Sequence, residues 1–222
     1  MKNSFLLTNE INAVKAGRAV GSTEFIVATD YPEIFSKDKD VTAYKTVKKS
    51  GDAQNCKFLY LADLTNDAIV DEVINATYDG AKLIVSANYS LDEIGAIYAR
   101  YKLSPVQVLH KYGLLDHCAV VGGVHLDRDD IDLMAQSGTP LILCPTASAG
   151  YGYGSPRYQA YRNKLVISLG SGDNRYNSSG NMIVEAQTLL LLVNCDMRSN
   201  SVVSECECLS LIGVTHETRL FD

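Results

Sequence analysis

The stretch from Leu114 to Met182 constrains the fold of this chain more than any other part of the sequence. Short apolar runs occur three times in it, at residues 119–121, 140–143 and 165–168. Each run ends at a glycine or Cys-Pro loop, and a helical pattern follows the first and the third. Alternation of strand, loop and helix predicts a parallel sheet covered by helices. In such folds the loops that follow the strands carry the chemistry.

The rest of the chain continues this alternation. Further strands are expected at residues 24–29, 57–62 and 83–87, with the remnant of another at residues 4–7. Helices are expected at residues 10–18, 66–78, 105–112, 127–136, 180–193 and 202–214, with one more that begins after Ser90 and is capped through Glu93. Residues 36–54 read as a loop with a short solvated helix, and residues 145–157 as a long loop. The sequence has no repeat or linker, which predicts one domain over residues 1–222.

Composition excludes several classes of partner. The net charge of −6 argues against nucleic acid, whose phosphates require a basic surface. No apolar run approaches the roughly 20 residues that span a bilayer, and the first residues turn polar too early for a signal peptide. Six scattered cysteines are typical of reduced thiols. We therefore expect a cytoplasmic protein that binds neither nucleic acid nor membrane.

A family resemblance rests on the order and spacing of several short motifs, and it extends loosely over most of the chain. The motifs are Gly113-Leu114-Leu115-Asp116, His125-Leu126, Gly138, Cys144-Pro145, Leu169-Gly170-Ser171, and Asn181-Met182 with Glu185, followed by a closing helix at residues 209–220. In these motifs the chain resembles the metal-dependent amidohydrolase superfamily. The similar branch contains the cytosine, guanine and adenosine-type deaminases and the triazine chlorohydrolases.

The resemblance implies an α/β fold with an eight-stranded (β/α) barrel of the TIM type and an adjoining β-sandwich. This chain is too short for both parts. We therefore expect an incomplete barrel of six or seven parallel strands without a sandwich, beginning after the first strand of the family. Open strand edges would need a cover, so we expect a homo-oligomer or a complex with a paralogous subunit.

The resemblance also implies where a metal would be held: two histidines on strand one, one each on strands five and six, and an aspartate on strand eight. On the last three strands these positions are occupied here by Ser86, Gly122 and Gly172. Tyr89 stands where the family has a general acid/base glutamate. A zinc site needs about three protein ligands, so we expect no metal and no cofactor.

Five further residues are candidates for chemistry. Asp173 lies one position past the aspartate site. It is either a displaced general base or a loop residue in a tight turn. His125 is either catalytic or a histidine at a helix entrance, and Cys144 is either a nucleophile paired with it or a small core residue. Tyr151 and Tyr153 lie in a glycine-rich stretch that is either a ligand-binding loop over the barrel or a flexible surface loop.

Three functions follow from these residues. The first is a degenerate amidohydrolase that has lost its metal site and serves as a scaffold or regulatory subunit. The second is a protein that binds a small ligand in the old pocket. The alternative is an active amidohydrolase or deaminase, completed by a partner chain, that acts on C–N bonds of a purine, pyrimidine or triazine-like ring.

Overall fold

A computed structural model describes residues 1–212 of the chain. All strands in this part pair in parallel within one sheet, in the order β8-β7-β6-β5-β4-β3-β2-β1-β9. Their bounds are β1 Lys2–Leu7, β2 Glu24–Thr29, β3 Val41–Val47, β4 Phe58–Leu61, β5 Lys82–Ala87, β6 Cys118–Gly122, β7 Leu141–Leu143, β8 Ile167–Leu169 and β9 Gly172–Asp173.

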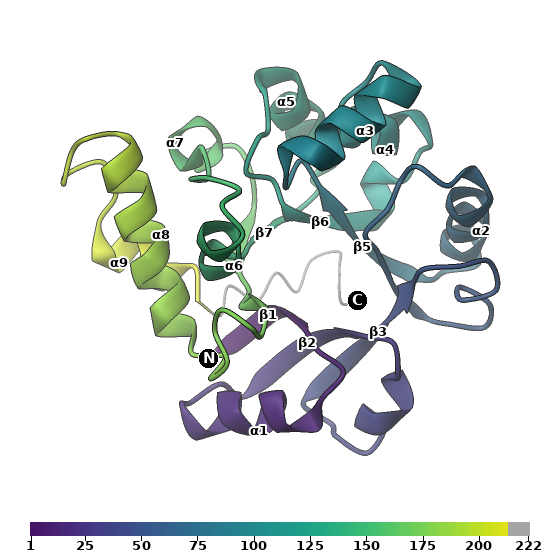
Figure 1. The fold of residues 1–222 in the computed structure, drawn as a ribbon, viewed down its shortest axis with the longest axis horizontal. Helices are drawn as coiled ribbons and strands as arrows, with labels where there is room; N and C mark the ends of the chain where they lie inside the picture. The colour runs from purple at the N-terminus through teal and green to yellow at the C-terminus, as the bar shows by residue number, and fades with distance from the viewer. Residues whose placement is uncertain (213–222) are drawn as a thin grey trace.

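The sheet curves into a ring (Figure 1). Its two end strands, β8 and β9, are separated in the chain only by Gly170 and Ser171, so residues 167–173 carry both ends of the sheet. Asn3 on β1 joins this segment, because its side-chain amide donates to Ser171 Oγ at 2.7 Å and its carbonyl accepts from Ser171 N at 3.1 Å. A Cβ on Gly170 would lie 2.7 Å from the backbone N and O of Phe5, so glycine permits this approach.

Helices surround the ring (Figure 1). Their bounds are α1 Ile11–Ala19, α2 Asp67–Tyr78, α3 Leu91–Tyr101, α4 Pro105–Lys111, α5 Arg128–Ser137, α6 Pro145–Gly150, α7 Tyr158–Tyr161, α8 Met182–Asp196 and α9 Glu205–Ser210, with 3₁₀ helices η1 Pro32–Phe35 and η2 Leu115–His117. The helical layer is incomplete, since only η1 connects β2 to β3 and no helix in the described chain connects β3 to β4.

The predicted (β/α) barrel of the amidohydrolase type is confirmed, and residues 1–212 contain no β-sandwich. The number of strands is higher than the six or seven expected. Residues 36–54 contain β3, which was missed because its inward face carries Tyr44 and Thr46 and the surrounding stretch is rich in lysine and acidic residues. Residues 145–157 contain α6, which begins at Pro145 despite the glycines that follow.

The expectation that the chain begins after the first strand is also wrong. β1 pairs with β2 on one side and with β9 on the other, so it fills the first position of the ring. The predicted remnant at residues 4–7 is part of this strand. A strand at this place leaves no gap beside β2 for a strand from another chain.

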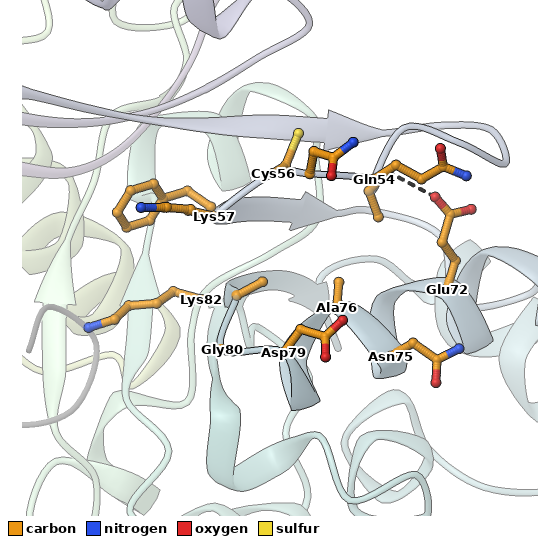
Figure 2. A pocket seen from close by; sticks show the side chains of 13 residues that line it. Gln54, Cys56, Lys57, Glu72, Asn75, Ala76, Asp79, Gly80 and Lys82 are labelled. Carbon is orange, nitrogen blue, oxygen red and sulfur yellow. Dashed lines mark hydrogen bonds between the residues drawn. The ribbon is translucent and has the colours of Figure 1, made fainter.

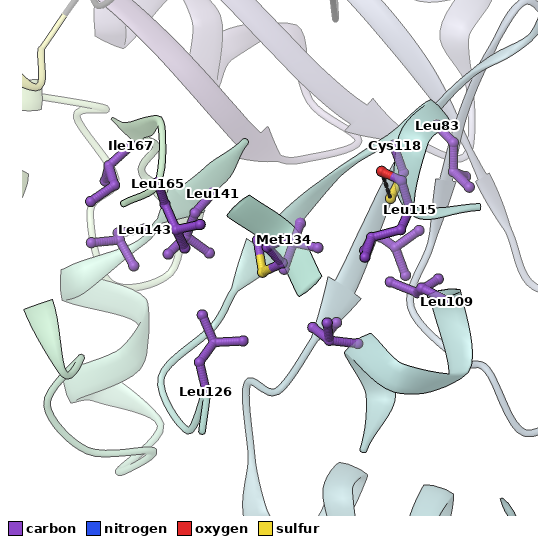
Figure 3. Close-up of a cluster of buried hydrophobic side chains, with 14 of the residues drawn as sticks. Leu83, Leu109, Leu115, Cys118, Leu126, Met134, Leu141, Leu143, Leu165 and Ile167 are labelled. Atoms are coloured by element: carbon purple, nitrogen blue, oxygen red, sulfur yellow. Dashed lines mark hydrogen bonds between the residues drawn. The ribbon is translucent and has the colours of Figure 1, made fainter. Parts of the chain in front are cut away.

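Buried apolar residues form three clusters in the described chain, two between the sheet and the helices and one inside the ring. The outer core lies between sheet and helices and includes Leu83 and Leu143, both nearly inaccessible to solvent (Figure 3). The inner core lies inside the ring and includes Phe5, Tyr44 and Tyr60. Neighbouring strand residues alternate between the outer clusters and the inner core, as the two-residue period of a strand requires.

Helix capping agrees with the sequence. Ser90 accepts from Glu93 N at 3.1 Å, while the Glu93 carboxylate accepts from Tyr89 N at 2.9 Å and from Ser90 N. On α3 the side chain of Ile97 is buried, whereas that of Tyr98 is 57% exposed. The predicted helix at 202–214 is represented by α9, whereas the closing helix at 209–220 lies largely outside the described residues. None of the described helices is long and apolar enough to cross a membrane.

Candidate functional site at the barrel mouth

The carboxyl ends of the strands open into two adjoining cavities at one end of the barrel. The first, here called the inner chamber, has a volume of about 190 Å³, and the second, the outer chamber, about 360 Å³. Leu7, Tyr60 and Asp173 line both chambers and form the boundary between them. The inner chamber is also lined by Phe5, Ser86, Tyr89, Val121, Cys144, Ala147, Tyr151, Tyr153 and Gly172, and the outer chamber by Thr8, Asn9, Glu10, Asp30, Thr46, Lys48, Ala62 and Asn174.

The structure brings most of the residues singled out in the sequence together at this mouth. Ser86, Tyr89 and Gly172 line the inner chamber, as do Tyr151 and Tyr153 of the glycine-rich stretch. Asp173 lines both chambers. Two strands and two loops that are distant in sequence therefore bring these residues to one cavity.

Two candidates lie outside the chamber walls. Gly122 ends β6 directly beneath the ring of Tyr89. His125 lies beyond it, near Gly154, and its Nε2 is buried without a hydrogen-bond partner within residues 1–212. Its backbone N–H donates to the Asn88 carbonyl at 3.0 Å, which fixes the loop that follows β6.

Both glycines at expected ligand positions are enclosed by neighbouring atoms. A Cβ on Gly122 would lie 2.5 Å from Tyr89 Cγ, and its φ of +103° is unfavourable for any other residue. A Cβ on Gly172, whose φ is +61°, would lie 3.0 Å from the Cβ atoms of both Cys144 and Ala147. A larger side chain at Gly122 would collide with the Tyr89 ring, and at Gly172 even a Cβ would press on Cys144 and Ala147.

The first strand contributes two residues that the sequence interpretation missed. Phe5 and Leu7 of β1 line the inner chamber, and β1 holds the ring position between β2 and β9. Their alternation was the available signal, but the short run was read as a remnant. β1 therefore presents apolar side chains to the chamber and carries no imidazole.

Four tyrosine rings form a continuous series over the mouth. Tyr89 meets Tyr153 edge to face at 4.9 Å, Tyr153 stacks on Tyr151 at 5.2 Å, and Tyr151 meets Tyr176 at 4.7 Å between ring centroids. Gly150 makes room for the last ring, since a Cβ there would lie 2.2 Å from Tyr176 Cδ1. The glycine-rich stretch is thus packed against the barrel.

Hydrogen bonds fix the rim of this series. The Tyr151 hydroxyl donates to the Asp173 carboxylate, which also accepts from Arg175 N at 2.9 Å. The hydrogen bond to Asp173, together with burial, raises the pKa of Tyr151 to about 12. Burial likewise raises the pKa of Tyr60 and of Tyr89. All three hydroxyls therefore stay protonated at neutral pH.

Cys144 has the environment of a core residue. It is 1% exposed, and burial, reinforced by the nearby Glu185 carboxylate, raises the pKa of its thiol well above the ordinary value. A nucleophilic cysteine needs the thiolate, which this environment disfavours. Its backbone carbonyl accepts from the Tyr89 hydroxyl at 3.5 Å, so the residue helps to place that ring.

A buried carboxylate positions α6 beside the mouth. Glu185 on α8 accepts from Thr146 N at 3.0 Å, from Thr146 Oγ1 at 2.5 Å and from Asn177 Nδ2 at 2.8 Å. Burial nevertheless raises its pKa, because desolvation outweighs these three hydrogen bonds. The carboxylate is fully partnered and serves to join α8 to the first turn of α6.

The donor atoms at the mouth do not fit the family's metal. Residues 1–212 contain no group of three His, Cys, Asp or Glu side chains arranged to hold one. The inner chamber offers the Asp173 carboxylate and a thiol with a raised pKa, whereas zinc prefers imidazole, thiolate and carboxylate in a tetrahedral set. The Asp30 carboxylate of the outer chamber is bound to Lys48 Nζ at 2.7 Å.

A larger hollow of about 810 Å³ lies at the opposite end of the barrel (Figure 2). It is lined by the beginnings of β4 and β5 and by the end of α2. The Glu72 carboxylate at its wall accepts from Gly51 N at 2.8 Å and Ala53 N at 3.1 Å, which fixes the loop before β4. Since (β/α) barrels place chemistry at the carboxyl ends of their strands, the smaller chambers are the better site.

Comparison with known proteins shows relatives over part of the chain. No family model matches the sequence. A 5-methylthioadenosine/S-adenosylhomocysteine deaminase of Caldicellulosiruptor saccharolyticus is 25% identical over 134 residues, which is 60% of this chain and 31% of that protein. The chain thus matches less than a third of this relative's length.

Solved structures agree in fold. A triazine hydrolase variant superposes with a TM-score of 0.75 at 15% identity, covering 90% of this chain and 57% of that one. A zinc-containing adenosine deaminase from Xanthomonas campestris gives a TM-score of 0.72 at 13% identity, over 95% and 64% of the two chains. Together with the order of the motifs, these relatives support a place for the chain in the amidohydrolase superfamily, whose barrel it shares.

Proposed function

We propose that this chain is a non-catalytic member of its superfamily that binds a small aromatic ligand in the barrel mouth. One observation carries the proposal: the positions expected to hold the metal are filled by packing. Tyr89 covers Gly122, Cys144 and Ala147 enclose Gly172, and β1 presents Phe5 in place of an imidazole.

The space that remains favours binding of a flat ring. The inner chamber keeps about 190 Å³, and tyrosine rings form much of its wall. Aromatic walls with a few polar groups are typical of small-molecule sites, and ring pairs contribute about 0.5–1.5 kcal/mol beyond buried area. The relatives named as deaminases act on ring-containing compounds. This chain is proposed to bind a ligand of that shape without catalysing the reaction.

The alternative of an active enzyme completed by a partner chain has less support. Its partner would have to insert a strand with His-x-His, but β1 already occupies that place between β2 and β9. It would also have to displace Tyr89 to reach Gly122. A neighbouring gene for a short protein with His-x-His would revive this alternative.

Metal content tests the loss of the metal site. Protein purified without chelator, then incubated with equimolar zinc and desalted, should retain far less than one zinc per chain by elemental analysis. About one tightly bound zinc per chain would overturn the proposal, as would deamination of a purine or pyrimidine by the purified chain.

A thermal-shift screen with purines, pyrimidines and pterins tests the binding site. A ligand at 100 times its Kd should stabilise the fold by about 2.7 kcal/mol. Tyr153→Ala should abolish that shift, whereas the matched variant Tyr78→Ala, on an exposed tyrosine of α2, should keep it. A shift that survives Tyr153→Ala, or no shift with any compound, would refute binding at this mouth.

Association with a second copy or a paralogous subunit remains part of the proposal. Open strand edges are no longer the expected cause of association, because both ends of the sheet meet in residues 167–173. α8 exposes Ile183 at 41% and Leu191 at 68%, which is an apolar surface suited to a partner. Light scattering at micromolar concentration tests it, and a lone monomer would count against it.

A further inference from the structure

The two chambers of the mouth differ in chemical character. The inner chamber is lined mainly by aromatic and aliphatic side chains, and among the described residues the one charged carboxylate on its wall is Asp173. The outer chamber is nearly twice as large and is lined mostly by polar side chains. A ligand that fills both must combine an apolar part with a polar part.

The tyrosines of the inner chamber offer ring surfaces more than free hydroxyls. The Tyr89 hydroxyl donates to the Cys144 carbonyl, and the Tyr151 hydroxyl donates to Asp173. Engaged hydroxyls cannot act as donors to a ligand at the same time. The chamber therefore selects for a flat apolar ring, and the electron-rich tyrosine faces favour positive charge nearby.

The outer chamber carries an excess of negative charge. Its walls hold the carboxylates of Glu10, Asp30 and Asp173, and within residues 1–212 Lys48 is the single ammonium that lines it. Lys48 is already bound to Asp30 at 2.7 Å, and this hydrogen bond lowers the pKa of Asp30, so both stay charged and compensate each other. Glu10 and Asp173 are left as the uncompensated charges on the walls.

Two other cations lie close by without lining either chamber. Lys45 Nζ donates to the Asp30 backbone carbonyl at 2.7 Å, and the Arg175 guanidinium lies 5.9 Å from the Tyr151 ring centroid. Asp173 sits at the junction of the chambers, where a group attached to a ring in the inner chamber would first emerge. A positive group there would approach both Asp173 and Tyr60.

We propose that the ligand of this mouth is an aromatic amine cation, with a flat ring in the inner chamber and a protonated amine in the outer chamber beside Asp173. The inference rests on the proposed function, since it names the class of ligand for the same site. It excludes anionic ring compounds, because their charge would face two uncompensated carboxylates.

Three probes that share the indole ring and differ in the charge of the attached side chain test the inference: tryptamine, tryptophol and indole-3-propionate. Isothermal titration at neutral pH should give the amine about tenfold tighter binding than the alcohol, equivalent to about 1.4 kcal/mol. The propionate should bind more weakly than the alcohol. Equal binding of amine and alcohol would overturn the inference and leave the proposed function standing.

Two variants of the outer chamber should shift the amine-to-alcohol ratio in opposite directions. Asp173→Asn should reduce it to about twofold, because one carboxylate is lost. Lys48→Met should increase it, because the Asp30 carboxylate then loses the ammonium bound to it. A variant that merely unsettles the fold would weaken both probes together, so opposite shifts cannot come from unfolding.

Asp79→Asn in the hollow at the other end of the barrel is the matched control and should leave the ratio unchanged. The inference would be overturned if the amine-to-alcohol ratio stayed the same in Asp173→Asn and Lys48→Met, or if it changed in Asp79→Asn. Absence of binding by all three probes would overturn it too, while the screen with neutral rings decides the proposed function separately.

Discussion

The outer core and the barrel mouth lie on the two faces of the same strands, yet they are built from different side chains. Along β5, Leu83 and Val85 pack outward against helices, while Ile84 and Ser86 face the interior. The outer core is aliphatic and continuous, whereas the mouth combines tyrosines, glycines and carboxylates. Stability resides mainly on the first face, and the second is free to change its chemistry.

The difference explains how the side chains at the mouth can change while the barrel keeps its fold. Ligand positions lie at strand ends on the inner face, so replacing them leaves the outer core untouched. In this chain Tyr89 packs over Gly122, and Phe5 of β1 forms part of the chamber wall. Close packing inside proteins favours such contacts, since a cavity in their place would cost stability.

The largest expected effect compares the two faces of one strand. Leu83→Ala removes a side chain that is fully buried in the outer core and should lower the free energy of unfolding by about 3 kcal/mol. Ser86→Ala, three residues later on the chamber wall, should cost less than about 1 kcal/mol. Urea unfolding followed by circular dichroism measures both. Equal losses of unfolding free energy in the two variants would contradict the difference between the two faces of the strand.

Gly122 tests how tightly the mouth is packed. Gly122→Ala places a Cβ against Tyr89 at a φ of +103°, and should lower the free energy of unfolding by about 2–3 kcal/mol through overpacking and backbone strain. Gly95→Ala, in the exposed middle of α3 with open space around it, should raise it by roughly 0.5–1 kcal/mol. Thermal denaturation of both variants checks whether each is less or more stable than the wild type. An unchanged stability of Gly122→Ala would show that Tyr89 moves freely.

Glu185 gives the stability of the mouth a pH dependence. Its folded-state pKa is raised, so between the ordinary glutamate pKa and this higher value the folded protein binds more protons than the unfolded one. Stability from this group is therefore present below that window and falls as the pH rises through it. Glu185→Gln should reduce the fall, at a cost of about 1–3 kcal/mol from imperfectly paired donors.

Glu93 and Asp130 also have raised pKa values and titrate in the same direction, so the comparison is between wild type and variant across pH. Urea midpoints from pH 4 to pH 8 provide the measurement. Parallel curves for the two proteins would show that the carboxyl group of Glu185 has an ordinary pKa.

The smallest effect concerns the outer surface of α8. Leu191→Ser should change the stability of the isolated chain by less than about 0.5 kcal/mol, because the side chain is 68% exposed. If α8 forms an interface, the variant should weaken association measured by light scattering. Tyr78→Ser, equally exposed on α2, is the control and should leave association unchanged.

Much of the fold could be predicted from periodicity and caps. β5, β6 and β7 and the helices after Ser90 and Ser104 are read directly from apolar runs and local capping residues, which act within a few positions. β3 and β1 were not recognised as barrel strands. Each has a mixed face that becomes intelligible only when its neighbours in the ring are known.

For the site, the sequence determined the chemical identity of each position: Ser86, Gly122 and Gly172 where the family has metal ligands, and the tyrosines of a glycine-rich stretch. The tertiary structure decided what fills the space, since Tyr89 reaches Gly122 across the β5–β6 pair and Phe5 reaches the chamber because β1 lies between β2 and β9. It also decided which charges oppose one another, because Glu10, Asp30 and Asp173 are distant in the chain but share one cavity wall. Spacing along a chain fixes local hydrogen bonds and alternation, whereas contact between distant strand ends depends on how the sheet closes.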